Sequence, residues 1–268
     1  MTARVAEILS QTAHRPWPIP KQPWIMTQAW KRLLFAHWPM DPELLKPLLP
    51  PGLALDTWQG QAWLGVVPFE MDFRLRFTPW TIRFGELNVR IYVVCEGKPG
   101  VLFVSLDASD PLTVYMARRV YSLPYYRADI AVNQRPDGII EYACQRRPLS
   151  NRNEAENSDK TKGHGTFRGQ YQPISPVFHA EKNTLEYWLT ERYCLYSSDQ
   201  AGRLYRGNIH HSPWPLQQAQ ASIEINTMAL ASGVHLPDSS PILHYADHID
   251  VMVWPLEKVT EERTPHAR

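Results

Sequence analysis

Residues 85–94 alternate strictly between apolar and polar side chains, and this segment constrains the fold more than any other part of the chain. Successive side chains of a β-strand point to opposite faces, so the alternation predicts a strand with one apolar and one polar face. The apolar face is Leu87, Val89, Ile91 and Val93, and the polar face is Glu86, Asn88, Arg90 and Tyr92. Such a polar row suits the inside of a barrel or cleft, because each group needs a partner when it is buried. The strand therefore predicts where a site lies, without defining a reaction.

The rest of the chain favours many short strands over long helices. Its 24 prolines interrupt regular structure often, and runs of β-forming residues recur from residue 62 onward. The predicted strands cover residues 62–69, 85–95, 101–106, 128–134, 138–147, 164–172, 184–190, 192–197, 203–211, 217–227 and 247–254. A Pro-Asp-Gly turn at residues 136–138 predicts a hairpin.

Three helices are predicted beside these strands. Residues 3–13 can form a short helix, and a Pro- and Trp-rich arm follows it in extended form. The helices at 41–49 and 111–122 each begin with an aspartate and a proline, where Asp41 and Asp110 can cap the first turn. Residues 150–163 are polar and are expected to form an exposed loop.

These elements predict a single α+β domain of mostly antiparallel β-structure. Many antiparallel strands with one central helix favour a curled sheet or barrel, closed or nearly closed, with a few peripheral helices. We expect a helix and arm at residues 1–26, the barrel domain at 27–258 and a C-terminal tail at 259–268.

Composition excludes several classes of function. The net charge is +1 without any block of Lys and Arg, so nucleic acid is not an expected partner. No run of ~18 apolar residues predicts a membrane span. The three cysteines lack metal or redox spacing and predict free thiols in a cytoplasmic protein. No glycine-rich nucleotide motif and no G-x-S-x-G motif occurs.

The histidines give no metal site. His244 and His248 have the spacing of a helical metal site, but their segment alternates like a strand, which would separate them by ~13 Å. His210 and His211 are adjacent in a predicted strand, so at most one enters a cavity. The alternative is that both are partly exposed and bond to the backbone.

Two interpretations of the polar strand remain open. The Cα atoms of Glu86 and Arg90 would lie ~13 Å apart, a gap that two long side chains can span towards one small ligand. The alternative is a structural ion network inside a barrel. Both arrangements perturb the pKa values of buried carboxylates.

Four segments of the chain resemble a known family. Residues 86–93, 102–109, 189–196 and 209–216 are similar, in this order, to the uncharacterised YqjF-like family, also described as DUF2071, over roughly residues 27–254. That family is in turn similar to the acetoacetate decarboxylase-like fold. The resemblance implies a cone-shaped antiparallel barrel that encloses a cavity.

One motif of the decarboxylases can be compared residue by residue. Those enzymes carry a stretch like G-R-E-x-x-G-F-P-K-K, whose first lysine forms a Schiff base with a β-keto acid. In the matching residues 117–126, Arg118 and Pro124 fit, but Tyr125 and Tyr126 replace both lysines. Glu86 resembles a cavity glutamate of these enzymes. A phenol cannot form an imine, so acetoacetate decarboxylase activity is not expected.

We therefore expect a cavity protein that binds a small organic acid or ketone and could also transform it, without a Schiff-base lysine, a cofactor or a metal ion. A carboxylate ligand would be held by Arg90 or Arg118, Tyr125 or Tyr126 would donate a hydrogen bond to a carbonyl or enolate, and Glu86 would move a proton. The other candidate ligand-binding residues are Tyr126, Arg192 and His210.

The alternative is a non-catalytic structural or interaction module whose barrel is packed with its own side chains. A polar cavity of ~300 Å³ or more that reaches solvent would favour ligand binding, and a packed interior would favour the module. Only Lys31 is expected to approach the sheet interior among the lysines. The sequence leaves both a monomer and a homo-oligomer open.

Overall fold

The computed structural model describes residues 3–148 and 164–259, which form one twelve-stranded sheet and a few short helices. The strands are β1 (Met26–Met40), β2 (Ala54–Leu55), β3 (Ala62–Leu75), β4 (Ile82–Cys95), β5 (Lys98–Ala108), β6 (Tyr125–Gln134), β7 (Ile140–Arg146), β8 (Thr166–Pro173), β9 (Cys194–Ser198), β10 (Leu204–His210), β11 (Gln217–Asn226) and β12 (Ile242–Lys258). The helices are α1 (Ala3–Ser10), α2 (Pro42–Leu45), α3 (Pro111–Val120) and α5 (Leu185–Thr190), with 3₁₀ turns η1 (Lys46–Leu48) and η2 (Leu230–Ser232). The loop predicted at residues 150–163 lies outside the described residues.

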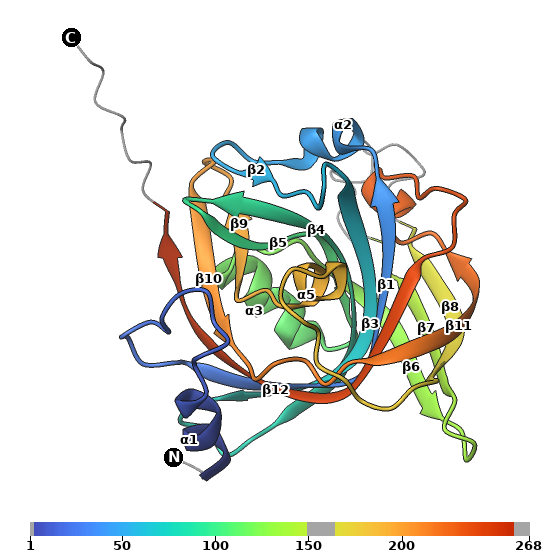
Figure 1. Cartoon of the computed structure of the whole chain (residues 1–268), viewed down its shortest axis with the longest axis horizontal. Coiled ribbons are helices and arrows are strands. Elements are labelled where there is room, and N and C mark those ends of the chain that lie inside the picture. The colour runs from blue at the N-terminus through green and yellow to red at the C-terminus, as the bar shows by residue number, and fades with distance from the viewer. Residues whose placement is uncertain (1–2, 149–163, 260–268) are drawn as a thin grey trace.

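The sheet closes on itself (Figure 1). Its strands follow the order β10-β9-β5-β6-β7-β8-β11-β12-β1-β3-β4-β2, and further pairings join β10 to β12 and β5 to β4. The pairings are antiparallel except where β5 runs parallel to β6 and to β9. They form two closed circuits of strands that share β1, β3, β4, β5 and β12. The predicted architecture, mostly antiparallel and closed or nearly closed, is confirmed.

The alternating side chains of β4 face two different interiors, one inside each circuit of strands. Leu87, Val89 and Ile91 belong to a large apolar core that also contains Tyr142 and Phe167, from the circuit closed by β6, β7 and β8. The opposite face of β4 points into the circuit closed by β9 and β10, where three of its polar side chains line a cavity. One strand thus supplies the packing of one interior and the chemistry of the other.

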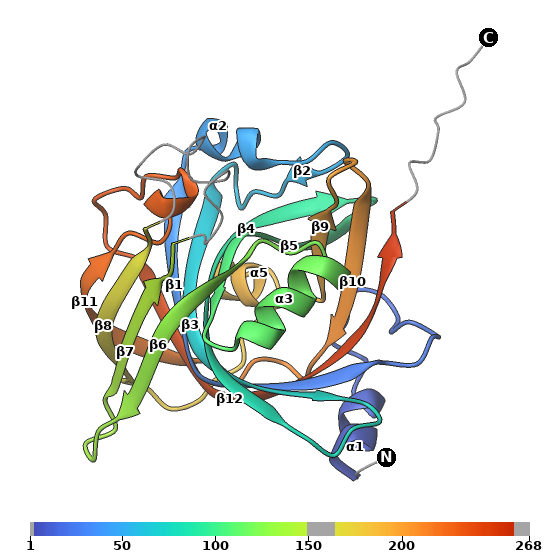
Figure 2. The same cartoon turned by 180° about the vertical axis from the view of Figure 1, so that it is seen from behind.

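The two helices that matter for the site lie on opposite sides of the strand ring. Helix α5 is nearer the viewer in Figure 1, and α3 is nearer in the reverse view of Figure 2. As predicted, the Asp110 carboxylate caps α3 by accepting a hydrogen bond of 2.7 Å from the Thr113 amide. Asp41 caps α2 in the same way, through the Glu43 amide at 2.9 Å, and this helix continues as the turn η1.

The prediction of a strand at residues 184–190 is wrong, because this segment forms the helix α5. The Thr184 hydroxyl accepts a hydrogen bond of 3.3 Å from the Tyr187 amide, which satisfies a free donor of the first turn. The acidic Glu186 in that turn also favours a helix start. In a run of only six residues, the apolar positions fit the helix period of 3.6 and the strand period of 2 equally well. The cap at Thr184 therefore favours the helix.

Strand β1 is missing from the predicted strands because it has little alternation. Residues 33–36 are all buried, so both faces of the strand carry apolar side chains. This follows from the place of β1 in both circuits, with an interior on each side. A bulge between Lys31 and Ala36, where Arg32 has a φ of 49°, further breaks the period.

No helix among residues 3–148 and 164–259 is long and apolar enough to cross a membrane.

Candidate functional site

An interior cavity of about 480 Å³ lies inside the circuit closed by β9 and β10. This volume falls within the ~300–1,000 Å³ typical of small-molecule sites. Most of its lining is apolar and includes Leu33, Val67, Phe69, Phe103, Leu106 and Trp214. This part of the ring is therefore not filled by the protein's own side chains.

The cavity brings together four of the residues singled out from the sequence. Glu86 and Arg90 project into it from β4, Tyr125 from the first position of β6, and Arg192 from the segment that follows α5. All four side chains are buried. The pairing of β4 with β5, and of β5 with β6, places Tyr125 next to Glu86 although they are distant in sequence.

Glu86 and Tyr125 form a direct hydrogen-bonded pair. The Tyr125 phenol donates to Oε2 of Glu86 at 2.9 Å, and the Tyr142 phenol donates to the Glu86 backbone oxygen at 2.7 Å. Burial raises the pKa of Glu86, the hydrogen bond from Tyr125 opposes this shift, and the nearby Asp107 adds to it, so that the pKa is about 8. Glu86 is therefore mostly protonated at neutral pH and ionises just above it.

Arg90 is a buried cation without a countercharge. The whole residue is 7% exposed. Its guanidinium lies 5.0 Å from the centre of the Phe35 ring and has no carboxylate within ion-pair distance among the described residues. Its Nη2 makes only long contacts, of 3.4 Å, with the Tyr92 phenol and the Leu189 carbonyl. Its Nε has no acceptor among the described protein atoms. Such a group is ready to bind an anion.

Arg192 differs from Arg90 because its charge is already compensated. Its Nη1 lies 2.6 Å from the Asp56 carboxylate, and its Nε donates to the Trp188 carbonyl at 2.6 Å. Its Nη2 nevertheless has no acceptor in the described part of the chain. Burial lowers the pKa of Arg192, and the charge of Arg90 lowers it further, so an anion near both guanidinium groups would relieve their repulsion.

The three other predicted residues do not line the cavity. Arg118 donates from Nε to the Tyr125 backbone oxygen at 2.5 Å and thereby supports the strand that carries Tyr125. Tyr126 points to the opposite face of β6, where the Arg146 guanidinium lies 4.0 Å from its ring centre. His210 bonds to the Ile8 carbonyl at 2.8 Å and so faces the N-terminal helix.

His211 lines the cavity instead of His210. Burial lowers the pKa of His211 to about 4, so its ring is neutral at physiological pH. Alternation indicates that only one of the two neighbours can face inward, but nothing in the sequence says which. The remaining polar lining residues that sequence reasoning missed are Gln28, Thr113, Tyr121 and Thr190. Asn88 was on the predicted polar face, and its Oδ1 lacks a donor among the described residues.

A structural ion network also exists, in the other interior. The Arg146 guanidinium binds the Asp107 carboxylate with two hydrogen bonds of 2.7 Å and the Ser105 hydroxyl at 2.8 Å. These three side chains are almost completely buried. The protein thus contains both a cavity with buried polar side chains and a structural ion network. The cavity lies in the circuit closed by β9 and β10, and the network lies in the circuit closed by β6, β7 and β8.

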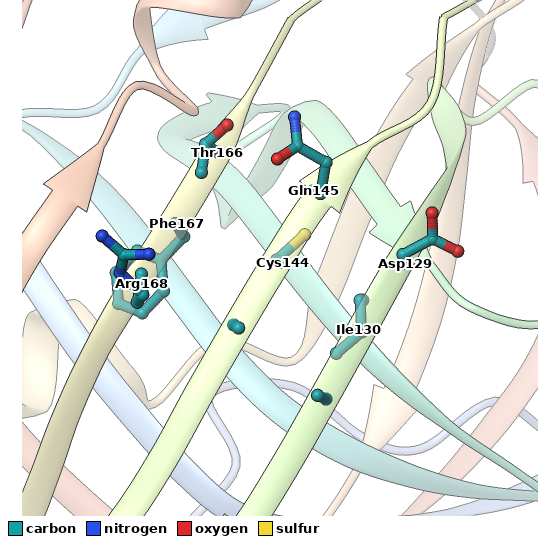
Figure 3. Close-up of a pocket in the computed structure, with 9 residues that line it drawn as sticks. Asp129, Ile130, Cys144, Gln145, Thr166, Phe167 and Arg168 are labelled. Carbon is teal, nitrogen blue, oxygen red and sulfur yellow. The ribbon is translucent and has the colours of Figure 1, made fainter.

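A second hollow, of about 330 Å³, lies over β6, β7 and β8 (Figure 3). Its two charged residues already have partners, since Asp129 binds Arg147 and Arg168 binds Glu224. Burial raises the pKa of Cys144 well above its ordinary value, so this thiol stays protonated and unreactive. The hollow therefore offers less chemistry than the interior cavity.

No lysine contributes to the lining of the interior cavity among the described residues. Lys31 binds the Asp72 carboxylate through Nζ at 2.6 Å and is half-buried. Tyr125, which replaces the first lysine in the motif comparison made from the sequence, faces the cavity as a phenol.

A closed, mostly antiparallel strand ring around such a cavity places this protein in the acetoacetate decarboxylase-like fold. The enduracididine biosynthesis enzyme MppR, in a complex with pyruvate, matches with a TM-score of 0.60 over 92% of this chain and 94% of that one, at 12% identity. An acetoacetate decarboxylase-like enzyme from Sphingomonas wittichii RW1 matches with a TM-score of 0.59 over 89% and 94% of the two chains, at 11% identity. At this identity the likeness shows the fold alone.

Within this fold, the chain belongs to the DUF2071 family, described as an uncharacterized conserved protein, whose model matches residues 27–250. The uncharacterized protein YqjF of Bacillus subtilis is 45% identical over 244 residues, which cover 90% of this chain and 95% of that relative. The predicted family and its link to the decarboxylase-like fold are therefore confirmed.

Proposed function

We propose that this protein binds a small organic carboxylate in the interior cavity, with Arg90 as the anchor, and transfers a proton at a carbon next to the ligand's carbonyl group. The observation that carries the proposal is the buried guanidinium of Arg90, which lacks a countercharge among the described residues and faces a cavity of about 480 Å³. We further propose that the protein works in the cytoplasm, consistent with its three free cysteines.

The energetic argument rests on charge burial. A buried and unpaired ion costs several kcal/mol even after the protein relaxes, and an anionic partner offsets that cost. A guanidinium group binds a carboxylate with two parallel hydrogen bonds, and Nε and Nη2 of Arg90 are the atoms with free or weakly used N–H groups. The free Nη2 of Arg192 would add a third donor.

The chemical argument rests on Glu86 and Tyr125. A group whose pKa is about 8 can act as both base and acid near neutral pH. In its ionised form, Glu86 would take a proton from the carbon, and the electron pair of the broken C–H bond would form an enolate. Protonated Glu86 is a weaker acceptor, so Tyr125 could then turn its phenol hydrogen to the enolate oxygen. Return of the proton restores the starting state.

A neighbour in the same fold supports the ligand class. MppR is known in a complex with pyruvate, and pyruvate carries the carboxylate and carbonyl that this cavity would recognise. The open cavity supports this proposal over a non-catalytic module with a packed interior. A mechanism without an imine is required here, since the described lining contains no lysine.

Titration with pyruvate and 2-oxobutanoate tests the binding step. We expect Arg90→Gln to weaken binding by about ten-fold or more, because hydrogen bonds to charged groups contribute ~1.5–3 kcal/mol. Arg168→Gln is the matched control, since this arginine is exposed and pairs with Glu224 outside the cavity. Equal affinities of the wild type and Arg90→Gln would contradict the proposal.

Deuterium exchange tests the proton transfer. In D₂O, we expect the wild type to exchange the C3 protons of 2-oxobutanoate, as followed by proton NMR, and Glu86→Gln to slow this by about 100-fold. The rate should rise with pH towards the pKa of Glu86, about 8. Exchange at the buffer rate in the presence of the wild type would remove the catalytic part of the proposal and leave binding.

A further inference from the structure

We infer that the ligand of this cavity is an amphiphile, namely a carboxylate with an extended apolar chain whose far end reaches the surface beside α3. This inference rests on the proposed anchoring of a carboxylate by Arg90 and adds the size and polarity of the remainder of the ligand. Four observations carry it: the separation of polar and apolar lining, the exposure at one end of the cavity, the charge around that end, and the volume.

The charged side chains of the lining are all buried. Arg90, Arg192, Thr190 and His211 line the cavity and are each less than 9% exposed. Arg90 and Arg192 also lie close to one another, since both guanidinium groups approach the Tyr92 ring, at 5.7 and 4.9 Å from its centre. A charged head group bound there would be withdrawn from water.

The apolar lining leads from this end to the surface. Four lining residues are exposed, namely Leu112 at 59%, Val120 at 56%, Met116 at 48% and Leu75 at 45%. Three of them follow one face of α3, and Leu75 ends β3. In Figure 2, α3 lies in front of the opening of the strand ring, nearer the viewer. The mouth of the cavity is therefore apolar, although a mouth that admits only a small polar acid would be expected to carry polar side chains.

The two segments that form the mouth carry positive charge only. Residues 73–83 and 111–120 contain five arginines, which are Arg74, Arg76, Arg83, Arg118 and Arg119, and no aspartate or glutamate. Arg83 lies 3.5 Å from the Asp72 carboxylate, and the other four have no ion-pair partner among the described residues. The net charge of the whole chain is only +1, so this concentration is local. Positive charge around an entrance attracts anions and raises their rate of entry. The combination of an apolar rim and cationic surroundings suits a long-chain carboxylate.

The volume agrees with this. A cavity of about 480 Å³ lies in the range that encloses drug-sized ligands, whereas a three-carbon acid has six heavy atoms and would leave most of the apolar lining without contacts. Filling that lining adds binding free energy of ~0.8 kcal/mol for each buried CH₂ group. A chain in the cavity would also cover Leu112, Met116 and Val120, which otherwise face water.

A chain-length series tests the inference. Butanoate, octanoate and dodecanoate, each below its micelle concentration, are titrated into the full-length protein by calorimetry, with 1-dodecanol as the uncharged counterpart of the longest acid. We expect affinity to rise by up to about four-fold per added CH₂ group, the equivalent of ~0.8 kcal/mol, until the chain reaches the mouth. Arg90→Gln should weaken the binding of all three acids.

Two variants of α3 distinguish the effect of a residue at the cavity mouth from that of a residue elsewhere on the helix. Met116→Asp introduces a charge into the apolar mouth, and we expect it to weaken dodecanoate at least ten-fold more than butanoate. Tyr115→Ser is the matched control, because Tyr115 is similarly exposed on α3 but does not line the cavity. Circular dichroism checks that both variants keep the fold.

The outcomes distinguish this inference from the proposed function. Equal affinity for butanoate and dodecanoate, with both weakened by Arg90→Gln, would overturn the amphiphile and leave carboxylate binding intact. Binding of dodecanoate that Arg90→Gln does not weaken, or binding of 1-dodecanol as tight as that of dodecanoate, would overturn the anchoring role of Arg90. If neither short nor long acids bind, both proposals fail.

Discussion

The Tyr125 phenol donates a hydrogen bond of 2.9 Å to the Glu86 carboxyl inside the cavity. In the motif comparison made from the sequence, Tyr125 stands at the position that resembles the Schiff-base lysine of the acetoacetate decarboxylases. A phenol cannot form an imine, whereas a hydrogen-bonded phenol and carboxyl group can exchange protons. The hydrogen bond also couples the titration of Glu86 to the presence of one hydroxyl group.

Glu86 makes the stability of the protein fall as pH rises. Its pKa is about 8 in the folded protein against 4.5 ordinarily, so between these values the folded state holds a proton that the unfolded chain has released. The free energy of unfolding therefore decreases through this window, by up to about 5 kcal/mol for this group. Glu86→Gln cannot ionise. Urea unfolding at pH 5 and pH 9 should show the variant gaining stability relative to the wild type at the higher pH. The same difference at both pH values would show that Glu86 titrates normally.

Tyr125→Phe should raise the pKa of Glu86 further. The hydrogen bond from Tyr125 stabilises the ionised carboxylate and is the one cause that opposes burial and the charge of Asp107. Titration of the Glu86 carboxyl carbon by carbon-13 NMR, with Glu86→Gln to assign the signal, measures this shift. Tyr126→Phe serves as the control, because that ring faces away from the cavity. A lower pKa in Tyr125→Phe would contradict the assigned role of the bond.

The buried pair of Arg146 and Asp107 should matter for stability but not for ligand binding. Asp107→Asn leaves a buried guanidinium without its countercharge, and such a change typically costs ~3–5 kcal/mol. Glu224→Gln breaks an exposed ion pair with Arg168 and should cost less than about 1 kcal/mol. Urea unfolding compares the two variants. A small effect of Asp107→Asn would show that the network is not a structural element.

Borohydride reduction in the presence of acetoacetate should leave no adduct on any lysine. An imine requires an amine that is neutral and within reach of the ligand, and the described lining of the cavity offers none. Lys31, the lysine expected to approach the interior, binds the Asp72 carboxylate at 2.6 Å and does not line the cavity. Mass spectrometry of the intact protein detects the adduct. A stoichiometric mass increase would contradict the exclusion of Schiff-base chemistry.

Sequence periodicity predicts those parts of the fold in which one face differs from the other. The alternation around Glu86 and Arg90 identifies β4 and the side chains that enter the cavity. Strand β1 escapes prediction because an interior lies on each of its faces, so its side chains are apolar in succession. Helix α5 is wrongly predicted as a strand because six residues do not define a period, and the cap at Thr184 is a weak signal in sequence alone.

Strand alternation and the family resemblance each identify some of the residues that line the cavity. Glu86, Arg90, Tyr125 and Arg192 all line the cavity. Which of His210 and His211 faces the cavity depends on which way the side chains alternate at the end of β10. Arg118 faces away from the cavity because of how α3 packs. The missing countercharge of Arg90 among the described residues depends on side chains of several strands, so it could not be inferred before the tertiary structure was known.

The anchoring of a carboxylate by Arg90 can be observed by NMR of its guanidinium group. The Nε–Hε signal of Arg90, assigned by its loss in Arg90→Lys, reports on an atom that lacks an acceptor among the described residues. During titration with pyruvate or octanoate, we expect this proton to shift strongly downfield and its exchange with water to slow, since it gains a charged hydrogen bond. An unchanged Arg90 signal at a concentration where calorimetry shows bound ligand would mean that Arg90 does not hold the carboxylate.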